Sequence, residues 1–279
     1  MKNDILTLIQ TSQDRKKELS RFVDSLNRQK GIDFSKIQLI FVDQGDNKSI
    51  FDRLNPSIDF VYIKTERCSL SHARNLALAN VFGEYVCFPD DDCWYEKDVL
   101  EKVLKVLEVG SYQGVCGIGK DENGILTSSF PKKQISITPI NIQAAISYTM
   151  FFKYSPRIFF DENMGVGSPY NIGSGEESDY MLNLIRYENY KVLYDPDIVI
   201  HHPTGQIYEK RFLLNKAYSY ARGFGYLMHK HEMPFIYKCK QIIRPIGGML
   251  IYALCMDFFK VKKSFYNLKG RLEGLFFRL

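Results

Sequence analysis

The chain has 279 residues, 45% of them hydrophobic and 14% aromatic, which is enough apolar material for a sizeable core and excludes a disordered chain. Its six cysteines form no CxxC pair and no metal-like spacing, so we interpret them as free thiols in a reducing compartment. The net charge of +5 is uneven: residues 238–279 hold nine Lys and Arg against two acids, a net of +7, which leaves −2 for residues 1–237. The first residues turn polar too soon for a secretory signal, and no apolar run reaches the roughly 18 residues of a membrane-spanning helix.

Strand-forming and helix-forming patterns alternate over the first hundred residues. Strands are expected at 5–10, 37–43, 58–64 and 84–88, and helices around 19–26 and over 69–82. This alternation predicts an α/β layer with a mostly parallel central sheet flanked by helices. Open sheets of this kind bind ligands beyond the carboxyl ends of their strands. The polar clusters 11–15, 43–47 and 90–92 all follow strands, so we expect them on one rim of the sheet.

The pattern is looser beyond residue 110. We expect a hairpin over 115–130 around an Asn-Gly turn, a Gly-rich loop over 163–175 and a helix over 176–188. A short strand over 197–203 and a long helix from about 206 come next. We divide the chain into an α/β domain, residues 1–230, and a basic, amphipathic helical extension, residues 231–279.

Three consecutive carboxylates, Asp90, Asp91 and Asp92, directly follow the strand 84–88. Like charges only a few Å apart repel by about 4 kcal/mol at an effective dielectric near 20, so the cluster needs a cation nearby or full solvation. Three interpretations stay open: a solvated turn, acids at a helix start, or a site for a divalent metal. Oxygen ligands of this kind suit Mg²⁺ or Mn²⁺ bound together with substrate phosphates.

A second acidic group, Glu176, Glu177 and Asp179, begins the helix expected over 176–188. Capping of the helix start is the simplest explanation for it. At about 100° per residue, however, Glu177 lies in the middle of the apolar face, whereas Asp179 lies opposite. Glu177 is therefore the better candidate for a site acid, and Asp179 is expected to face solvent.

Two adjacent histidines, His201 and His202, end the strand expected over 197–203. Successive side chains of a strand point to opposite faces, so only one of the two is expected to face the site. The alternation does not decide which. A structural role and a metal-ligand role both stay open for that residue.

With these residues in view, the chain resembles a family 2 glycosyltransferase of the GT-A fold, over about residues 4–230. The resemblance rests on five motifs in the family's order: the opening strand with "SQDR", "FVDQGDN", "SHARNLAL", the DxD motif as "FPDDD", and the acidic motif as "GSGEESD". One such motif is weak, but five in order are specific. The ending "LKGRLEG" is similar to that of bacterial surface-polysaccharide members.

The resemblance implies a metal-dependent, inverting enzyme that moves a sugar from a nucleotide donor, usually a UDP-sugar, to a saccharide or a lipid-linked saccharide in cell-surface polysaccharide synthesis. It implies Mn²⁺ or Mg²⁺ at Asp92 and Asp90, with His201 as the histidine that best fits the family's pattern. The remaining implied roles are donor binding by Thr11, Asp43, Arg74, Asp90 and Asp91, base catalysis by Glu177 with Glu176 beside it, and weaker acceptor-side roles for Trp94, Tyr220 and Arg222. The family more often has Asp at the position of Glu177.

The basic, phenylalanine-rich tail predicts peripheral attachment to an anionic membrane, on the inner face of the cytoplasmic membrane, where a lipid-linked acceptor would lie. No nucleic-acid module accompanies the positive charge, so nucleic acid is not an expected partner. Two alternatives stay open for the whole chain. One is a sugar nucleotidyltransferase, whose Gly-rich first turn is absent here, and the other is a non-catalytic scaffold that binds nucleotide sugars.

Overall fold

The computed structural model describes residues 5–204 and 208–278. It divides the chain into two compact units. The sheet unit comprises Met1–Cys68, His72–Phe159 and Asn183–Gly205, and the helical unit comprises Ser69–Ser71, Phe160–Leu182 and Gln206–Leu279. Each unit is described below by itself.

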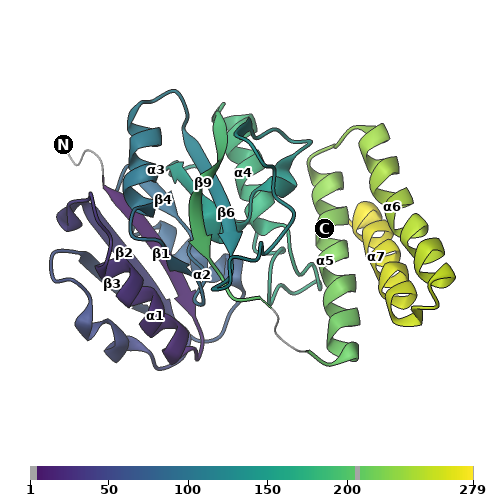
Figure 1. Cartoon of the computed structure of the whole chain (residues 1–279), viewed down its shortest axis with the longest axis horizontal. Coiled ribbons are helices and arrows are strands. Elements are labelled where there is room, and N and C mark those ends of the chain that lie inside the picture. The colour runs from purple at the N-terminus through teal and green to yellow at the C-terminus, as the bar shows by residue number, and fades with distance from the viewer. Residues whose placement is uncertain (1–4, 205–207, 279) are drawn as a thin grey trace. The chain divides into compact units, whose positions relative to one another are not determined.

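A single mixed sheet forms the sheet unit (Figure 1). Its strands are β1 Leu6–Ser12, β2 Ile37–Asp43, β3 Asp59–Lys64, β4 Tyr85–Cys87, β5 Trp94–Tyr95, β6 Gly114–Lys120, β7 Ile135–Ser136, β8 Met150–Lys153 and β9 Val192–His201. The order is β3-β2-β1-β4-β8-β6-β9-β5, with β7 paired to β9. The pairs β1–β2, β2–β3, β1–β4 and β6–β9 are parallel, whereas β8 runs antiparallel to both β4 and β6.

The helices are α1 Lys16–Asn27, α2 Leu70–Leu78, α3 Val99–Glu108, α4 Glu176–Tyr187, α5 Lys210–Lys230, α6 Phe235–Leu254 and α7 Phe258–Phe276. Short 3-10 helices occupy Phe34–Lys36, Lys48–Arg53, Ile142–Ala144 and Ser147–Thr149. Among the described residues, no helix has both the length and the apolar character needed to cross a membrane.

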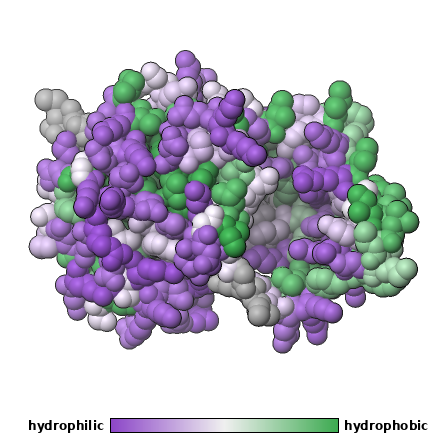
Figure 2. Space-filling view, viewed as in Figure 1, coloured by the Kyte–Doolittle hydropathy of each residue, from purple (hydrophilic) through white to green (hydrophobic). Residues whose placement is uncertain are grey.

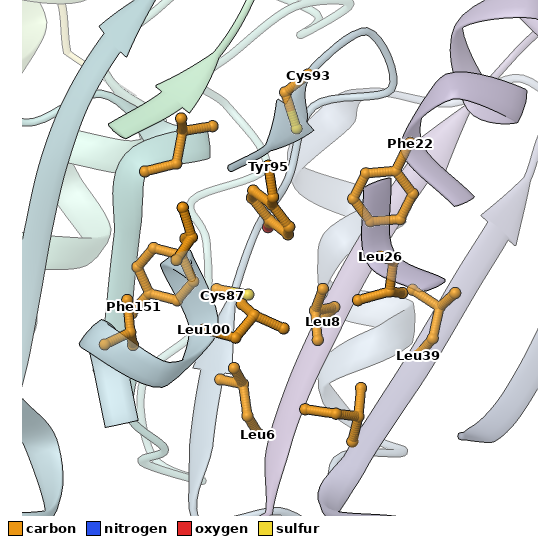
Figure 3. Packing of buried hydrophobic residues seen from close by; sticks show 14 of the residues in the cluster. Leu6, Leu8, Phe22, Leu26, Leu39, Cys87, Cys93, Tyr95, Leu100 and Phe151 are labelled. Carbon is orange, nitrogen blue, oxygen red and sulfur yellow. The ribbon is translucent and has the colours of Figure 1, made fainter. Parts of the chain in front are cut away.

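The core of the sheet unit lies between one face of the sheet and the helices α1 and α3. Alternate β1 residues such as Leu6 and Leu8 point into it, as the period of two in a strand requires. Phe22 of α1 meets Tyr95 edge to face with ring centroids 5.7 Å apart (Figure 3). Because β1, β2 and β4 all contribute residues to this core, the core holds in place the strand ends from which the polar clusters 11–15, 43–47 and 90–92 follow.

Several sequence predictions agree with these elements, and others need correction. The strand expected over 37–43 is β2 residue for residue, and the first helix-strand alternation is present. β9 begins at Val192, five residues before the expected strand. The hairpin expected over 115–130 is present as a short turn at Gly124, with an antiparallel bridge between Lys120 and Leu126 and a backbone hydrogen bond from Thr127 N to Gly119 O, although its second arm is not a full strand.

The predicted domain boundary at residue 230 also differs from the observed division, because α5 belongs to the same unit as α6 and α7. The reason is close helix packing through glycine. A Cβ on Gly274 of α7 would lie 2.0 Å from the backbone oxygen of Arg222 in α5, and one on Gly225 of α5 would lie 2.3 Å from that of Arg271 in α7. Only residues without a side chain allow two helix backbones this close.

Candidate active site

The three aspartates after β4 are held by cationic and hydroxyl groups of the sheet unit. Asp90 lies 3.3 Å from the guanidinium of Arg74 and accepts a hydrogen bond from Ser147 Oγ at 3.3 Å. Arg74 is almost fully buried, with its side chain 2% exposed. The predicted convergence of this cluster at the end of β1 is present, because Ser12, the last residue of β1, donates a hydrogen bond to Asp91 Oδ2 at 2.7 Å.

Asp92 carries the strongest contacts of the three. Arg15 Nη1 lies 2.5 Å from its Oδ2, and His202 Nε2 lies 3.0 Å from its Oδ1. Burial opposes ionisation, but the hydrogen bond from His202 and the charge of Arg15 hold the pKa of Asp92 below its ordinary value. The pKa of His202 is raised by the same contact, although burial alone would lower it.

Asp91 has the opposite electrostatic environment. Burial raises its pKa to about 6, against the hydrogen bond from Ser12 and the charge of Arg15, whose Nε lies 3.7 Å from its Oδ1. Adjacent carboxylates therefore have different proton affinities at this sheet edge. Asp92, whose pKa is lowered, is the more readily ionised of these two, and Arg15 and His202 are its partners in this structure.

The two histidines face different partners, as strand alternation requires. His201 Nε2 lies 2.7 Å from Glu96, and its ring stacks on Trp94 at a centroid distance of 5.0 Å. His202 is the one directed to the aspartates, with Nε2 also 4.0 Å from Asp90 Oδ2. His202 is therefore the histidine that the structure directs toward the aspartates, and the metal-ligand role that the resemblance implies for His201 stays a prediction.

The types of ligand suit Mn²⁺ or Mg²⁺: carboxylates from Asp90 and Asp92 and an imidazole from His202. Within the described residues, no group of three or more His, Cys, Asp and Glu side chains is arranged to hold a metal ion. In this structure the Arg15 guanidinium is already paired with Asp92. A metal would have to displace that contact.

Two other predicted residues of the sheet unit are engaged by the protein itself. The carboxylate of Asp43 is fully buried and accepts hydrogen bonds from Gly45 N, Asn47 N, Asn47 Nδ2 and Tyr62 Oη. These bonds hold the turn after β2, and Asp43 acts there as an Asx-turn residue. Trp94 lies between His201 and the Arg21 guanidinium, which is 3.7 Å above its ring.

Thr11 is the penultimate residue of β1 and pairs with Val42 of β2. It is half-buried, next to Ser12 and therefore close in the chain to the Asp91 contact. This is consistent with its predicted place on the rim.

The second acidic group begins α4, and part of its prediction was wrong. Asp179 is fully buried, with Oδ1 2.8 Å from His231 Nε2 and 2.9 Å from Lys230 Nζ, both at the end of α5. The helical wheel placed it opposite the apolar face but could not show that Lys230 and His231 pack on that side. Asp179 is an internal ion-pair residue and does not face solvent.

Glu176 and Glu177 differ in exposure. Glu176 is buried, 5% exposed, beside Gly165, where an added Cβ would lie 3.1 Å from the Glu176 carboxyl carbon. Glu177 is half-buried. Gly175, which precedes them, has a φ of +95°, a conformation that favours glycine, so the entry into α4 depends on that residue.

Of the three weaker acceptor-side candidates, Trp94 lies on β5, and Tyr220 and Arg222 lie on α5. Tyr220 keeps 40% of its surface exposed, with Lys216 Nζ 5.2 Å from its ring centroid. Arg222 instead packs over Phe277 at 5.0 Å and is hydrogen-bonded to Tyr218 Oη at 3.4 Å. Arg222 therefore serves the contact between α5 and the end of the chain.

The sequence model described as "Glycosyl transferase family 2" matches residues 8–176, more than half of the chain. The chain belongs to glycosyl transferase family 2. The matched segment runs from β1 to Glu176. It contains the three aspartates after β4 and the first glutamate of the second acidic group. Family membership argues against the sugar nucleotidyltransferase alternative.

A curated relative, "Glycosyltransferase GlyA" of Streptococcus pneumoniae serotype 4 (strain ATCC BAA-334 / TIGR4), is 29% identical to this family 2 glycosyltransferase over 123 residues. That alignment covers 42% of this chain and 17% of the relative. The chain thus spans under a fifth of the length of that protein.

Solved structures share the fold. The crystal structure of S. aureus TarS has a TM-score of 0.60 at 16% identity, over 93% of this chain and 54% of TarS. The mannosyltransferase PcManGT from Pyrobaculum calidifontis, in complex with GDP-Man and Mn²⁺, has a TM-score of 0.64 at 14% identity, over 98% of this chain and 88% of that one. TarS 1–349 in complex with UDP-GlcNAc has a TM-score of 0.59 at 14% identity, over 98% and 93% of the two chains.

Proposed function

We propose that this family 2 glycosyltransferase transfers a sugar from a UDP-sugar to a saccharide or lipid-linked saccharide, with inversion at the anomeric carbon, in the synthesis of a cell-surface polysaccharide. The observation that carries the proposal is the cluster at the edge of the sheet, where Asp90, Asp91 and Asp92 meet Arg74, Arg15 and His202. Such a set combines negative ligands for a cation with positive groups for a diphosphate.

Asp90, Asp92 and His202 would hold the Mn²⁺ or Mg²⁺, and Asp91, Arg74 and Thr11 would contact the donor. When bound, the metal supplies neutralisation of the charge that develops on the departing diphosphate. The mannosyltransferase that shares the fold holds Mn²⁺ and GDP-Man, and TarS holds UDP-GlcNAc, which supports a nucleotide-sugar donor. Asp43 contributes by holding the turn at 43–47, since its own carboxylate is engaged.

Glu177 would take the proton of the acceptor hydroxyl as that oxygen attacks the anomeric carbon. It is the more exposed of the two glutamates at the start of α4, whereas buried Glu176 would support the turn at Gly165. A single displacement forms the new C–O bond while the bond to the diphosphate breaks, so the product has the inverted configuration and no covalent enzyme intermediate is needed. Tyr220, with its exposed ring, is the acceptor-side candidate that the protein leaves most accessible.

The test is to incubate the purified chain with individual UDP-sugars and Mn²⁺ and to measure UDP release onto water and onto saccharide acceptors. We expect turnover with one UDP-sugar. The NMR signal of the anomeric proton in the product should report the configuration opposite to that of the donor. UDP binding without release of any sugar would contradict the proposal and favour the non-catalytic scaffold.

A further inference from the structure

The outer sides of α6 and α7 expose two rows of large apolar side chains with the same spacing. The α6 row is Ile236, Ile243, Leu250 and Leu254, and the α7 row is Phe258, Phe265, Leu272 and Phe276. Spacings of seven, seven and four residues keep each row on one face of its helix. The α6 row is 63–85% exposed, so these side chains make little contact within the chain.

The opposite sides of the same helices are packed. Gln241 and Pro245 are the buried residues of α6, and Gly270 and Gly274 are buried in α7. Arg271 donates a hydrogen bond to the backbone oxygen of Gln241, which joins the inner sides of the two helices. The inner faces of α6 and α7 pack within the helical unit, so the apolar rows on the opposite faces point outward. Figure 2 shows hydrophobic residues, in green, along the visible side of α6.

The charge beside these rows is mostly positive. No acidic residue occurs between Glu232 and Asp257, and the exposed Lys240 and Arg244 lie to one side of the α6 apolar row, about 40° and 80° around the helix from Ile236. Lys262 and Lys269 lie at similar positions beside the α7 row. Of the two acids of this region, Asp257 contacts Lys260 at 2.8 Å and Glu273 contacts Lys269 at 3.8 Å, so Lys262 is the base beside the α7 row that neither acid pairs with in these contacts.

We propose that the α6 and α7 rows with their flanking lysines and arginine form a surface that docks in the plane of an anionic phospholipid membrane. A helix with an outward apolar face and basic flanks is the type that lies at the boundary of head groups and acyl chains. The basic side chains would contact lipid phosphates, and the apolar rows would enter the acyl region. A second copy of this chain is a poorer occupant, because parallel pairing of two α6 rows would bring Lys240 and Arg244 against like charges, and antiparallel pairing would leave these bases without an acidic partner on α6.

The experiment is flotation of the full chain with vesicles of pure phosphatidylcholine and of phosphatidylcholine mixed with phosphatidylglycerol. Binding to the mixed vesicles that weakens with added salt is expected. The double change Ile243→Ser and Leu250→Ser should abolish flotation. The matched control, Val109→Ser and Ile125→Ser, removes exposed apolar side chains from the sheet unit and should float like wild type.

A second pair of variants distinguishes the effect of charge beside the α6 row on vesicle binding from the effect of the net charge of the chain. Lys240→Gln with Arg244→Gln should weaken partitioning roughly fivefold for each charge removed, whereas Lys132→Gln with Lys133→Gln, on an exposed segment of the sheet unit, should not. Thermal melting checks that all variants remain folded. Failure of wild type to float with anionic vesicles, or flotation of the Ile243 and Leu250 variant at wild-type level, would overturn the proposal. So would a dimer in light scattering that these two changes dissociate without any vesicle binding by wild type.

Discussion

His201 and His202 show how much depends on the direction of single side chains at the sheet edge. His201 is the last residue of β9 and His202 follows it, yet the first stacks on Trp94 and the second contacts Asp92. Strand alternation could be read from the sequence, but the direction of each side chain depends on the pairing of β9 with β5 and β6. β5 has only two residues, Trp94 and Tyr95, and a strand this short has no hydrophobic pattern from which it could be predicted.

The histidine assignment can be tested by two single substitutions. His202→Ala should weaken Mn²⁺-dependent UDP binding by about 10–100-fold, because it removes a ligand and a partner of Asp92. His201→Ala should leave that affinity close to wild type, since its ring contacts Glu96 and Trp94. Isothermal titration with UDP and Mn²⁺ measures both, and equal losses in the two variants would contradict the assignment.

The glutamates at the start of α4 give a second residue-scale prediction. Glu177→Gln should lower kcat by about 10²–10⁴-fold with little change in UDP affinity, as expected for loss of a general base. Glu122→Gln, a change of the same kind at an exposed site of the sheet unit, is the control. Steady-state kinetics with the donor found in the sugar screen provides the measurement. If Glu176→Gln abolishes kcat while Glu177→Gln does not, the roles proposed for the two residues are reversed.

The environment of Asp179 could not be predicted from the local sequence. The wheel identified an apolar face on α4 correctly through Tyr180 and Leu184, which are both fully buried. It could not show that Lys230 and His231, some fifty residues later, would bury the other side. Contacts between distant segments are absent from any local pattern.

At the scale of elements, glycines determine how α5 and α7 pack. Gly274→Ala should destabilise the helical unit by about 1–3 kcal/mol, because the new Cβ would lie 2.0 Å from the Arg222 backbone oxygen. Gly247→Ala on α6, where an added Cβ meets nothing within 4 Å, should instead stabilise the chain by about 0.8–1 kcal/mol through helix propensity. Urea unfolding of both variants checks the prediction. Similar effects of the two changes would show that close packing of α5 on α7 is unimportant.

The elements that the sequence predicted well are those with strong internal patterns. β1 to β4 and the helices α1 and α4 each have a continuous apolar run or a clear amphipathic period. β5, β7 and β8, of two to four residues, were not predicted. Their strand character comes from pairing with β4, β6 and β9, so it depends on the assembled sheet.

At the scale of the whole molecule, the free energy of unfolding should depend on pH through the ion pairs of the helical unit. Asp161 lies 2.7 Å from Lys230. Burial opposes ionisation, but the hydrogen bonds from Lys230 and Asn163 hold the pKa of Asp161 below its ordinary value of 3.8. A carboxyl group with a lowered folded-state pKa stabilises the folded protein above the unfolded-state value, and this contribution is lost as the pH falls through the folded-state value.

The prediction is therefore that wild type exceeds Asp161→Asn in free energy of unfolding above about pH 4, and that the difference shrinks as the solution becomes more acidic. Urea titrations over a pH series measure it. Asp46→Asn is the matched control, since Asp46 is almost fully exposed and lies 3.9 Å from Lys16. A difference between wild type and Asp161→Asn that stays constant with pH would contradict the ionic explanation.

A division into two parts was predicted from the sequence, but the place of the division differs from the observed one. The predicted boundary lies after residue 230, whereas α5 belongs with the C-terminal helices through backbone contacts at Gly225 and Gly274. Composition reports charge and hydrophobicity, but close approach of helices depends on which faces carry small residues.

The central claim is that the aspartates after β4 bind a metal together with the diphosphate of a UDP donor. Calorimetric titration of UDP, with and without Mn²⁺, into wild type and Asp92→Ala tests it most directly. We predict binding by wild type that requires Mn²⁺ and is lost in Asp92→Ala. UDP binding that is independent of Mn²⁺, or that survives in Asp92→Ala, would contradict the claim.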